Sequence, residues 1–298
     1  MANLKRKLEL LCDVALANIY KVRVKYDLRI RHNISASQQV EPSIMVSLTT
    51  YGHRLRHSVE YTLYSLLKQE LRPAKIVVWC DKDEVKPELL PKSYELFQQY
   101  GVEFKEYAPA IRSYKKLIPT LINYPDYHHI IVDDDLYYSP KLIKELFAAH
   151  QQEPDAIIAQ AITTPLFDKT GKNLLPYKQW PQYIGLKKPL EYNKITIVPL
   201  GYGSIFYPKD VFDKEVENEE VFRKLCPQAD DLWFYVQGLR LRRNKVKLNT
   251  KKDYFLPVDL IRQILKKDRL HDTNFGEGQN NIQLNNLLDH YNIKLEQL

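Results

Sequence analysis

The sequence has few cysteines, and their arrangement argues against two kinds of covalent framework. Its 298 residues include only three, Cys12, Cys80 and Cys226. The count is odd and the spacings are long, so neither a disulfide framework nor a zinc-binding pattern is indicated. This usage is typical of a reducing compartment, and we expect a cytoplasmic protein.

The sequence also lacks a long apolar run. No stretch approaches the roughly 18 residues that a membrane span requires. The apolar N-terminal stretch "LELLCDVALANIY" is interrupted by Asp13 and Asn18, and no small-residue cleavage site follows it, so we expect no signal peptide. Without internal repeats or a clear linker, one mixed α/β domain with terminal additions is the expected organisation.

Negative charge is in deficit. The 37 acidic residues are outnumbered by 44 lysines and arginines, which gives a formal net charge of +7. A basic surface attracts anions such as nucleic acid, anionic lipid or phosphorylated small molecules, and the sign of the charge does not choose among them. Hydrophobic residues make up 44% of the chain and charged residues 27%, which predicts an ordinary packed core.

Residues 1 to about 32 have the periodicity of an amphipathic helix. Its apolar stripe consists of Leu4, Leu8, Leu11, Ala15, Ile19 and Val22. Lysines and arginines surround this stripe at positions 5, 6, 7, 21, 23 and 25. The simpler interpretation is a helix that packs on the domain, and the alternative is a helix that lies on an anionic membrane surface.

Strand-like and helix-like segments alternate from residue 43 to about residue 162. Predicted strands cover 43–51, 72–80, 102–107, 128–135 and 155–162, and predicted helices cover 55–70, 91–101, 113–125 and 139–152. In the last helix, Ser139 is the expected N-cap and Pro140 the first helical residue. Continuous apolar strands between amphipathic helices predict an α/β fold with a mixed, mostly parallel sheet and helices on both faces.

The second half has a different composition. Residues 163–194 are rich in proline, lysine and aromatic residues, which is typical of a long functional loop or a small subdomain. Strand composition returns at 195–208, where Gly201 and Gly203 flank Tyr202. A helix, a turn and a strand are predicted from Ala229 to about residue 248, and an Asn-rich helix near the end of the chain.

Three consecutive aspartates, Asp133, Asp134 and Asp135, follow the apolar run Ile130–Val132. Ligands of open α/β sheets bind beyond the carboxyl ends of the strands, where these carboxylates are expected. Because side chains alternate along a strand, Asp133 and Asp135 are predicted to point the same way. Oxygen ligands at this spacing suit Mg²⁺ or Mn²⁺. The structural alternative is that the aspartates simply end a strand.

Four sequence elements together resemble the nucleotide-sugar glycosyltransferases of the GT-A fold, the type that builds bacterial surface polysaccharides. The similarity covers roughly residues 43–250. Its elements are Thr50-Tyr51 after the first strand, Ser65-Leu66 and Gln69 in the following helix, Asp81 after the second strand, the D-x-D of Asp133 and Asp135, and the pair Asp230-Asp231. Cys80 stands where the commoner pattern has a first acidic residue.

The resemblance implies roles for these residues. The implied nucleotide-sugar-binding residues are Thr50, Tyr51, Asp81, Asp133 and Asp134. Arg56 and Lys116 are added from their charge. Arg54 and Arg56 are both possible diphosphate contacts. Arg112, Lys115 and Lys116 lie at a predicted helix start, where positive charge opposes the helix dipole, so they are expected to have an anionic partner, either a diphosphate or a surface carboxylate. The implied metal ligands are Asp133, Asp135 and His271, with Mn²⁺ or Mg²⁺ as the cofactor. Asp231 is the implied general base, with Asp230 second, and the implied acceptor-binding residues are Tyr202, Gly203 and Trp233. We expect one of the two adjacent aspartates to cap its helix.

The predicted organisation has three parts. Residues 1–40 form the N-terminal helix and connector, 41–255 the GT-A-like domain, and 256–298 a C-terminal helical tail. Within the domain, 43–162 is the expected nucleotide-binding half and 163–255 the acceptor-binding half. The resemblance implies transfer from a nucleotide-diphosphate donor, a UDP-sugar being the first expectation, to a glycan or lipid-linked glycan in bacterial capsule or lipooligosaccharide synthesis.

Two other functions stay open at this point. A nucleotidyltransferase shares the fold and the metal chemistry, but "TTYGHRLRH" lacks its glycine-rich signature. A nucleic-acid-binding protein using "RLRRNKVKLNTKK" would explain the basic charge, but acidic clusters repel phosphates, so we expect no nucleic-acid partner. The same basic cluster and the N-terminal helix suit peripheral docking at the inner face of the cytoplasmic membrane.

Overall fold

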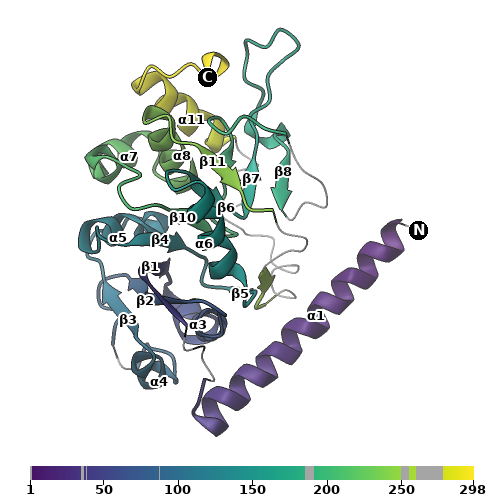
Figure 1. Ribbon diagram of the computed structural model, residues 1–298, viewed down its shortest axis with the longest axis vertical. Coiled ribbons are helices and arrows are strands. Elements are labelled where there is room, and N and C mark those ends of the chain that lie inside the picture. Colours follow the sequence, from purple (N-terminus) through teal and green to yellow (C-terminus); the bar gives the residue numbers. More distant parts are fainter. Residues whose placement is uncertain are drawn as a thin grey trace.

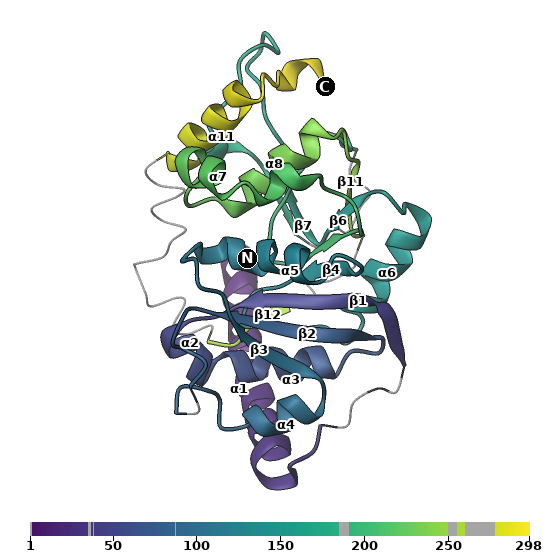
Figure 2. The same cartoon turned by 90° about the vertical axis from the view of Figure 1, so that its left-hand side faces the viewer.

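The computed structural model describes residues 2–34, 37, 39–86, 88–184, 191–249, 255–259 and 278–298. A seven-stranded sheet lies at its centre, in the order β11–β6–β10–β4–β1–β2–β3 (Figures 1 and 2). Its strands are β1 (Val40–Thr49), β2 (Arg72–Cys80), β3 (Val102–Glu106), β4 (His128–Ile131), β6 (Ile157–Ala159), β10 (Ile205–Tyr207) and β11 (Lys245–Lys247).

The sheet is mostly parallel. Strand β1 pairs in parallel with β2 and β4, β2 with β3, and β6 with β11. Strand β10 runs antiparallel to β4 and β6. Two smaller sheets join β5 (Leu136–Tyr138) to β12 (Phe255–Pro257), and β7 (Ala161–Thr163) to β8 (Gln182–Ile184) and β9 (Val198–Pro199).

Helices cover both faces of the large sheet. The first face packs against α3 (Val59–Leu67), α4 (Tyr94–Gln99) and α6 (Leu142–Gln152). The second packs against α5 (Ile118–Asn123), α7 (Glu219–Leu225), α8 (Asp230–Arg240) and α11 (Gln279–His290). Successive strand side chains serve opposite faces, so Ile130 enters the first core and Ile131 the second. The predicted fold class is thereby confirmed.

The other helical elements among the described residues are α1 (Ala2–Tyr26), α2 (Gly52–His57), the π-helical turn η1 (Asp27–Arg31), and the 3₁₀ turns η2 (Arg112–Lys116), η3 (Tyr177–Gln179), η4 (Lys214–Glu217) and η5 (Leu295–Gln297). Two predicted helices are each broken in two. The segment 55–70 breaks at Ser58, whose hydroxyl donates to the carbonyl of Arg54 at 3.2 Å. The segment 113–125 breaks before α5, where Pro119 suits a new first turn.

Several predicted boundaries are wrong. The strand 155–162 divides at the buried Gln160, because β6 and β7 belong to different sheets. The strand 195–208 is interrupted by a turn at residues 201–203. Helix α6 begins at Leu142 with Lys141 at the N-cap, so Ser139 and Pro140 precede the helix.

Gln69 braces the chain that follows the aspartates. Its side chain is fully buried. Its amide nitrogen donates to the carbonyl of Ser139 at 2.7 Å, and its amide oxygen accepts from the backbone N–H of Ile143 at 3.1 Å. That N–H lies in the first turn of α6, where backbone N–H groups have no acceptor within the helix. The Ser65–Gln69 element is thus a structural brace, since Ser65 also accepts from the N–H of Tyr138 at 3.1 Å.

We predict that Gln69→Ala lowers the free energy of unfolding by about 2–4 kcal/mol, because two buried backbone groups lose their partner. Urea denaturation measures the change. The control is Gln98→Ala, which removes an exposed side chain that bonds Tyr94 and should cost less than about 0.5 kcal/mol. If the two variants are equally stable, Gln69 does not brace this segment as proposed.

Candidate active site at the carboxyl edge of the sheet

The three aspartates lie in the turn between β4 and β5. Strand β4 ends at Ile131, so the prediction of a strand reaching Asp135 is wrong and strand alternation does not orient the carboxylates. Asp134 is buried, whereas the side chains of Asp133 and Asp135 are 23% and 21% exposed. The turn therefore still leaves the two residues of the D-x-D partly accessible and the middle one enclosed.

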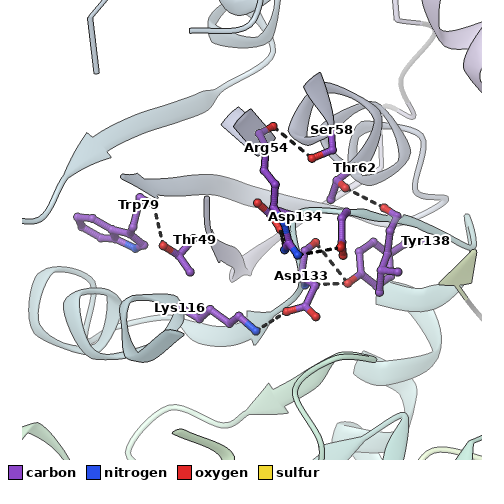
Figure 3. A network of polar contacts seen from close by, with 11 residues as sticks. Thr49, Arg54, Ser58, Thr62, Trp79, Lys116, Asp133, Asp134 and Tyr138 are labelled. Carbon is purple, nitrogen blue, oxygen red and sulfur yellow. Dashed lines mark hydrogen bonds and ion pairs between the residues drawn. The ribbon is translucent and has the colours of Figure 1, made fainter. Parts of the chain in front are cut away.

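Two cations hold this acidic turn in place (Figure 3). From α2, Arg54 donates to Asp134 at 2.8 Å and pairs with Asp135 at 3.3 Å. From η2, Lys116 pairs with Asp133. The hydroxyl of Tyr138 accepts from the backbone N–H of Asp133 at 2.8 Å. The repulsion among the carboxylates is thus relieved in part by the protein's own side chains.

The relief is incomplete. Burial, followed by the charge of Asp133, raises the pKa of Asp135 to about 6. Burial also raises the pKa of Asp134, against the opposing charge of Arg54. The buried hydroxyl of Thr50 lies beside the carboxylate of Asp134 and acts to lower the pKa of Asp134, but burial outweighs it. Additional positive charge at this turn would therefore be stabilising.

The second acidic pair opens helix α8. Ala229 occupies the N-cap, so neither Asp230 nor Asp231 caps the helix as expected, and both lie in its first turn. Ser113 donates to Asp230 at 2.8 Å. The N–H of Gly201 donates to both oxygens of Asp231, at 3.0 and 3.1 Å. Burial, followed by the charge of Asp230, raises the pKa of Asp231 to about 7.

Lys116 connects the two acidic groups. Its side chain is 13% exposed and pairs with Asp133. Burial acts to lower the pKa of Lys116, but Asp133, Asp230 and Asp231 together raise it above its ordinary value. One ammonium group is therefore stabilised by carboxylates from the turn after β4 and from α8, which indicates that the two acidic elements lie close together.

The expected nucleotide-binding residues lie along the ends of β1 and β2. Thr50 is buried directly after β1, and the ring of Tyr51 is about half exposed, with the guanidinium of Arg54 5.9 Å from its centroid. Asp81 follows β2 with a 43% exposed side chain, and it pairs with the ammonium of Lys115, which is almost completely buried. A buried lysine thus fixes a carboxylate that faces solvent.

One contact was missed in the sequence. Ser113 donates to Asp230, and no local motif marks it. Arg54, a possible diphosphate contact from the sequence, and Lys115, expected to have an anionic partner, pair with Asp134 and Asp81 respectively. Gly201 belongs to the Gly-Tyr-Gly turn, and a Cβ atom there would lie 2.7 Å from an oxygen of Asp231. Only glycine leaves room for that carboxylate.

Other predicted site residues lie elsewhere. Arg56 is exposed on α2 and makes no ion pair with a described residue, so Arg54 takes its expected place. Trp233 is completely buried and donates to the carbonyl of Val216 at 2.9 Å, so it is a core residue and not an acceptor platform.

Only one of the two acceptor residues predicted in the glycine turn is partly exposed. Gly203 is buried, and a Cβ there would meet Ala161 at 3.3 Å. Tyr202 is partly exposed, with its ring 6.0 Å from that of Phe255. Tyr202 therefore remains the candidate acceptor contact of this turn.

The basic cluster at the end of α8 is not an exposed patch. Lys245 and Lys247 are buried, and Arg240 pairs with Asp213 at 3.0 Å. Arg243 donates to the carbonyl of Val211 at 2.9 Å. These contacts remove the main support for the nucleic-acid alternative, and for membrane docking through this cluster. Residues 251 and 252 lie outside the described residues.

A divalent cation at this turn would need oxygen atoms from a bound substrate in addition to the described side chains. Within the described ranges, no group of three His, Cys, Asp or Glu side chains could hold a metal ion. His271, the predicted third ligand, lies outside those ranges. Mg²⁺ and Mn²⁺ are commonly held by one or two carboxylates together with substrate phosphates. The partly accessible pair Asp133 and Asp135 suits that mode, in which phosphate oxygens would complete the coordination.

No protein-family model matches the sequence, and no curated protein matches it. Many solved structures are similar in fold, and three of them are given as examples. They are a CMP:2-keto-3-deoxy-manno-octonic acid synthetase complexed with CTP (TM-score 0.45, 10% identity, 75% of this chain and 97% of that chain), S. aureus TarS (0.42, 16%, 72% and 36%), and the mannosyltransferase PcManGT from Pyrobaculum calidifontis in complex with GDP-Man and Mn²⁺ (0.43, 11%, 95% and 84%). At TM-scores below 0.5, these likenesses carry no argument about activity.

We predict that Asp231→Asn is more stable than the wild type at pH 8, by up to about 4 kcal/mol. The folded pKa of about 7 exceeds the unfolded value of about 3.9. The folded protein therefore keeps a proton that the unfolded chain loses, and the wild type loses stability as pH rises through this window. Asparagine carries no charge, so its advantage should vanish below about pH 4.

Urea denaturation of both proteins at pH 4 and pH 8 measures this difference. The control is Asp126→Asn, whose side chain is 85% exposed and should change stability by less than about 0.5 kcal/mol at either pH. If Asp231→Asn is no more stable than the wild type at pH 8, the conclusion that the charged Asp231 side chain destabilises the folded protein is wrong.

Proposed function

We propose that this protein is a metal-dependent glycosyltransferase that moves a sugar from a nucleotide-diphosphate donor to a carbohydrate acceptor. The observation that carries the proposal is the environment of Lys116, which pairs with Asp133 and whose pKa is also raised by the charges of Asp230 and Asp231. A donor-binding acidic turn and a candidate base thus share one site at the sheet edge where ligands of α/β folds bind.

The donor's nucleoside is assigned to the ends of β1 and β2. The half-exposed ring of Tyr51 offers a stacking face, and Asp81, held by Lys115, can accept hydrogen bonds from a base or ribose. Thr50, which precedes Tyr51, is buried beside the carboxylate of Asp134. A UDP-sugar is the donor that we test first, from the family resemblance.

The diphosphate is assigned to the acidic turn. Asp133 and Asp135 would hold Mn²⁺ or Mg²⁺, whose chemistry when bound is to neutralise charge on the leaving diphosphate. Arg54 and Lys116 already pair with these carboxylates. Both cations can also donate to phosphate oxygens, so they can exchange a carboxylate partner for the donor.

Asp231 is assigned as the general base for an inverting transfer. Its pKa of about 7 lets it accept a proton from an acceptor hydroxyl near neutral pH. The N–H of Gly201 contacts both carboxylate oxygens and fixes their orientation. Asp230 keeps Ser113 as a partner and contributes negative charge that raises the basicity of Asp231. Tyr202 lies on the adjoining turn as the acceptor contact.

The acceptor and setting are proposed from the resemblance. We assign a glycan or lipid-linked glycan acceptor, in bacterial capsule or lipooligosaccharide synthesis at the cytoplasmic face of the membrane. The site chemistry supports any acceptor with a hydroxyl group that reaches Asp231.

The test is thermal denaturation with a panel of nucleotide-diphosphate sugars, with and without Mn²⁺. A true donor at about 100 times its Kd should stabilise the protein by about 2–3 kcal/mol, and this gain should require the metal. Asp135→Asn should abolish the metal-dependent gain and sugar transfer, while Asp126→Asn should keep both.

Several outcomes would overturn the proposal. These are a panel in which no nucleotide sugar stabilises the protein in a metal-dependent way, full activity in Asp135→Asn, and release of pyrophosphate from a nucleoside triphosphate in place of sugar transfer. The last result would indicate a nucleotidyltransferase.

A further inference from the structure

Helix α1 presents an apolar stripe to solvent. Leu11, Ile19, Val22, Tyr26 and the following Ile30 recur at three-, four- and eight-residue spacings, and each is between 54% and 70% exposed. The helix packs on the domain, as the simpler interpretation of the sequence has it, but this stripe is not the face that packs. A contiguous row of large exposed apolar side chains is unusual on a protein surface and indicates a binding surface.

The opposite face of α1 is fixed to the body of the protein. Ala17, Val24 and Leu28 are buried. The ring of Tyr20 lies 5.2 Å from that of Tyr137 on β5, and Lys21 pairs with Asp259. The helix is thus held in a defined orientation, and Figure 1 shows it as a rod whose N-terminal end stands clear of the body. Its outward face is not free to turn inward while these contacts persist.

The charge of α1 identifies the partner. The helix contains six basic and two acidic residues. Arg23 and Lys25 are exposed, and at about 100° per residue they fall on opposite borders of the stripe. A second copy of the helix would bring these like charges face to face. Basic residues that border an apolar stripe can instead extend to lipid phosphates while the stripe enters the bilayer surface.

We propose that the stripe of α1 binds an anionic membrane surface, lying in the plane of the lipid headgroups. No helix among the described residues is long and apolar enough to cross a membrane, which agrees with surface binding. The proposal concerns where the protein works and not what it transfers. Binding to lipid vesicles and stabilisation by a nucleotide sugar are therefore independent results, and either can be absent while the other is observed.

Membrane binding would also orient the candidate active site. Strand β5, which Tyr20 contacts through Tyr137, begins directly after Asp135. Strand β12 pairs with β5, and the N–H of Val258 donates to the carbonyl of Asp135 at 2.8 Å. A docked α1 therefore holds the acidic turn at a fixed distance from the lipid surface, which suits an acceptor anchored in lipid.

The experiment uses the full chain and its own cysteines. Cys12 is exposed beside the stripe, whereas Cys80 and Cys226 are buried, so a thiol-reactive, polarity-sensitive fluorophore labels Cys12 selectively. We expect the emission to shift to the blue with vesicles of phosphatidylcholine and phosphatidylglycerol, much less with phosphatidylcholine alone, and the shift to weaken in high salt. Sedimentation of unlabelled protein with the same vesicles excludes an effect of the dye.

Three variants separate the contributions. Ile19→Asp with Val22→Asp should lower the partition coefficient at least tenfold, since two apolar contacts become charges that anionic lipid repels. Arg23→Gln with Lys25→Gln should lower it by about five-fold per charge. Ile282→Asp on α11, where Ile282 is 53% exposed, is the matched control and should bind as the wild type does.

Each alternative gives a distinct result that overturns the proposal. Absence of binding to anionic vesicles, or equal binding to neutral ones, excludes the lipid assignment. Loss of binding in the Ile282→Asp control would show that the effect is not specific to the stripe. Concentration-dependent dimers in analytical ultracentrifugation, abolished by Ile19→Asp with Val22→Asp, would assign the stripe to a second copy of the chain. Circular dichroism of all variants checks that they are folded.

Discussion

The ion pair between Lys116 and Asp133, in the field of Asp230 and Asp231, is the interaction on which the site depends. Without a cation there, carboxylates from two distant parts of the chain could not lie near one another beneath the protein surface, because like charges repel strongly in a partly desolvated setting. Lys116 lies in the 3₁₀ turn η2, immediately before the break at α5. The break thus helps to place a positive charge near both the turn after β4 and the start of α8.

The same site contains carboxylates whose charged forms are destabilised by their surroundings. Burial raises the pKa values of Asp135 and Asp231 to about 6 and 7, and one oxygen of Asp230 is buried without a partner among the described residues. A chain selected only for stability would avoid such groups. Their cost is offset elsewhere, for example by the buried amide of Gln69, which secures the segment that follows the aspartates. The unfavourable charge is what a cationic ligand or a transferred proton would relieve.

The sequence predicts those features that depend on local pattern. Continuous apolar strands such as Ile76–Trp79 identify the buried sheet, and its carboxyl edge follows from the strand direction. The aspartates and the pair Asp230-Asp231 were assigned to one site, and one cation, Lys116, does lie in the field of both.

The sequence pattern could not predict contacts that depend on tertiary structure. Arg54 and Arg56 are equivalent in sequence, but only one faces the acidic turn. Trp233 and Gly203 have suitable chemistry for an acceptor but are enclosed by neighbours far along the chain. The apolar stripe of α1 has the periodicity of a core helix, and only the fold shows that its other face is the one that packs.

The central claim is that the two acidic elements, joined by Lys116, form one site for a nucleotide-diphosphate sugar and its metal ion. The most direct measurement is the anomalous diffraction of a crystal soaked with Mn²⁺ and a donor identified by thermal shift. We predict a manganese peak in contact with the carboxylate of Asp133 or Asp135 and with the diphosphate, and the donor's sugar facing Asp231. A nucleotide bound away from this edge, or a peak that touches neither carboxylate, would contradict the account.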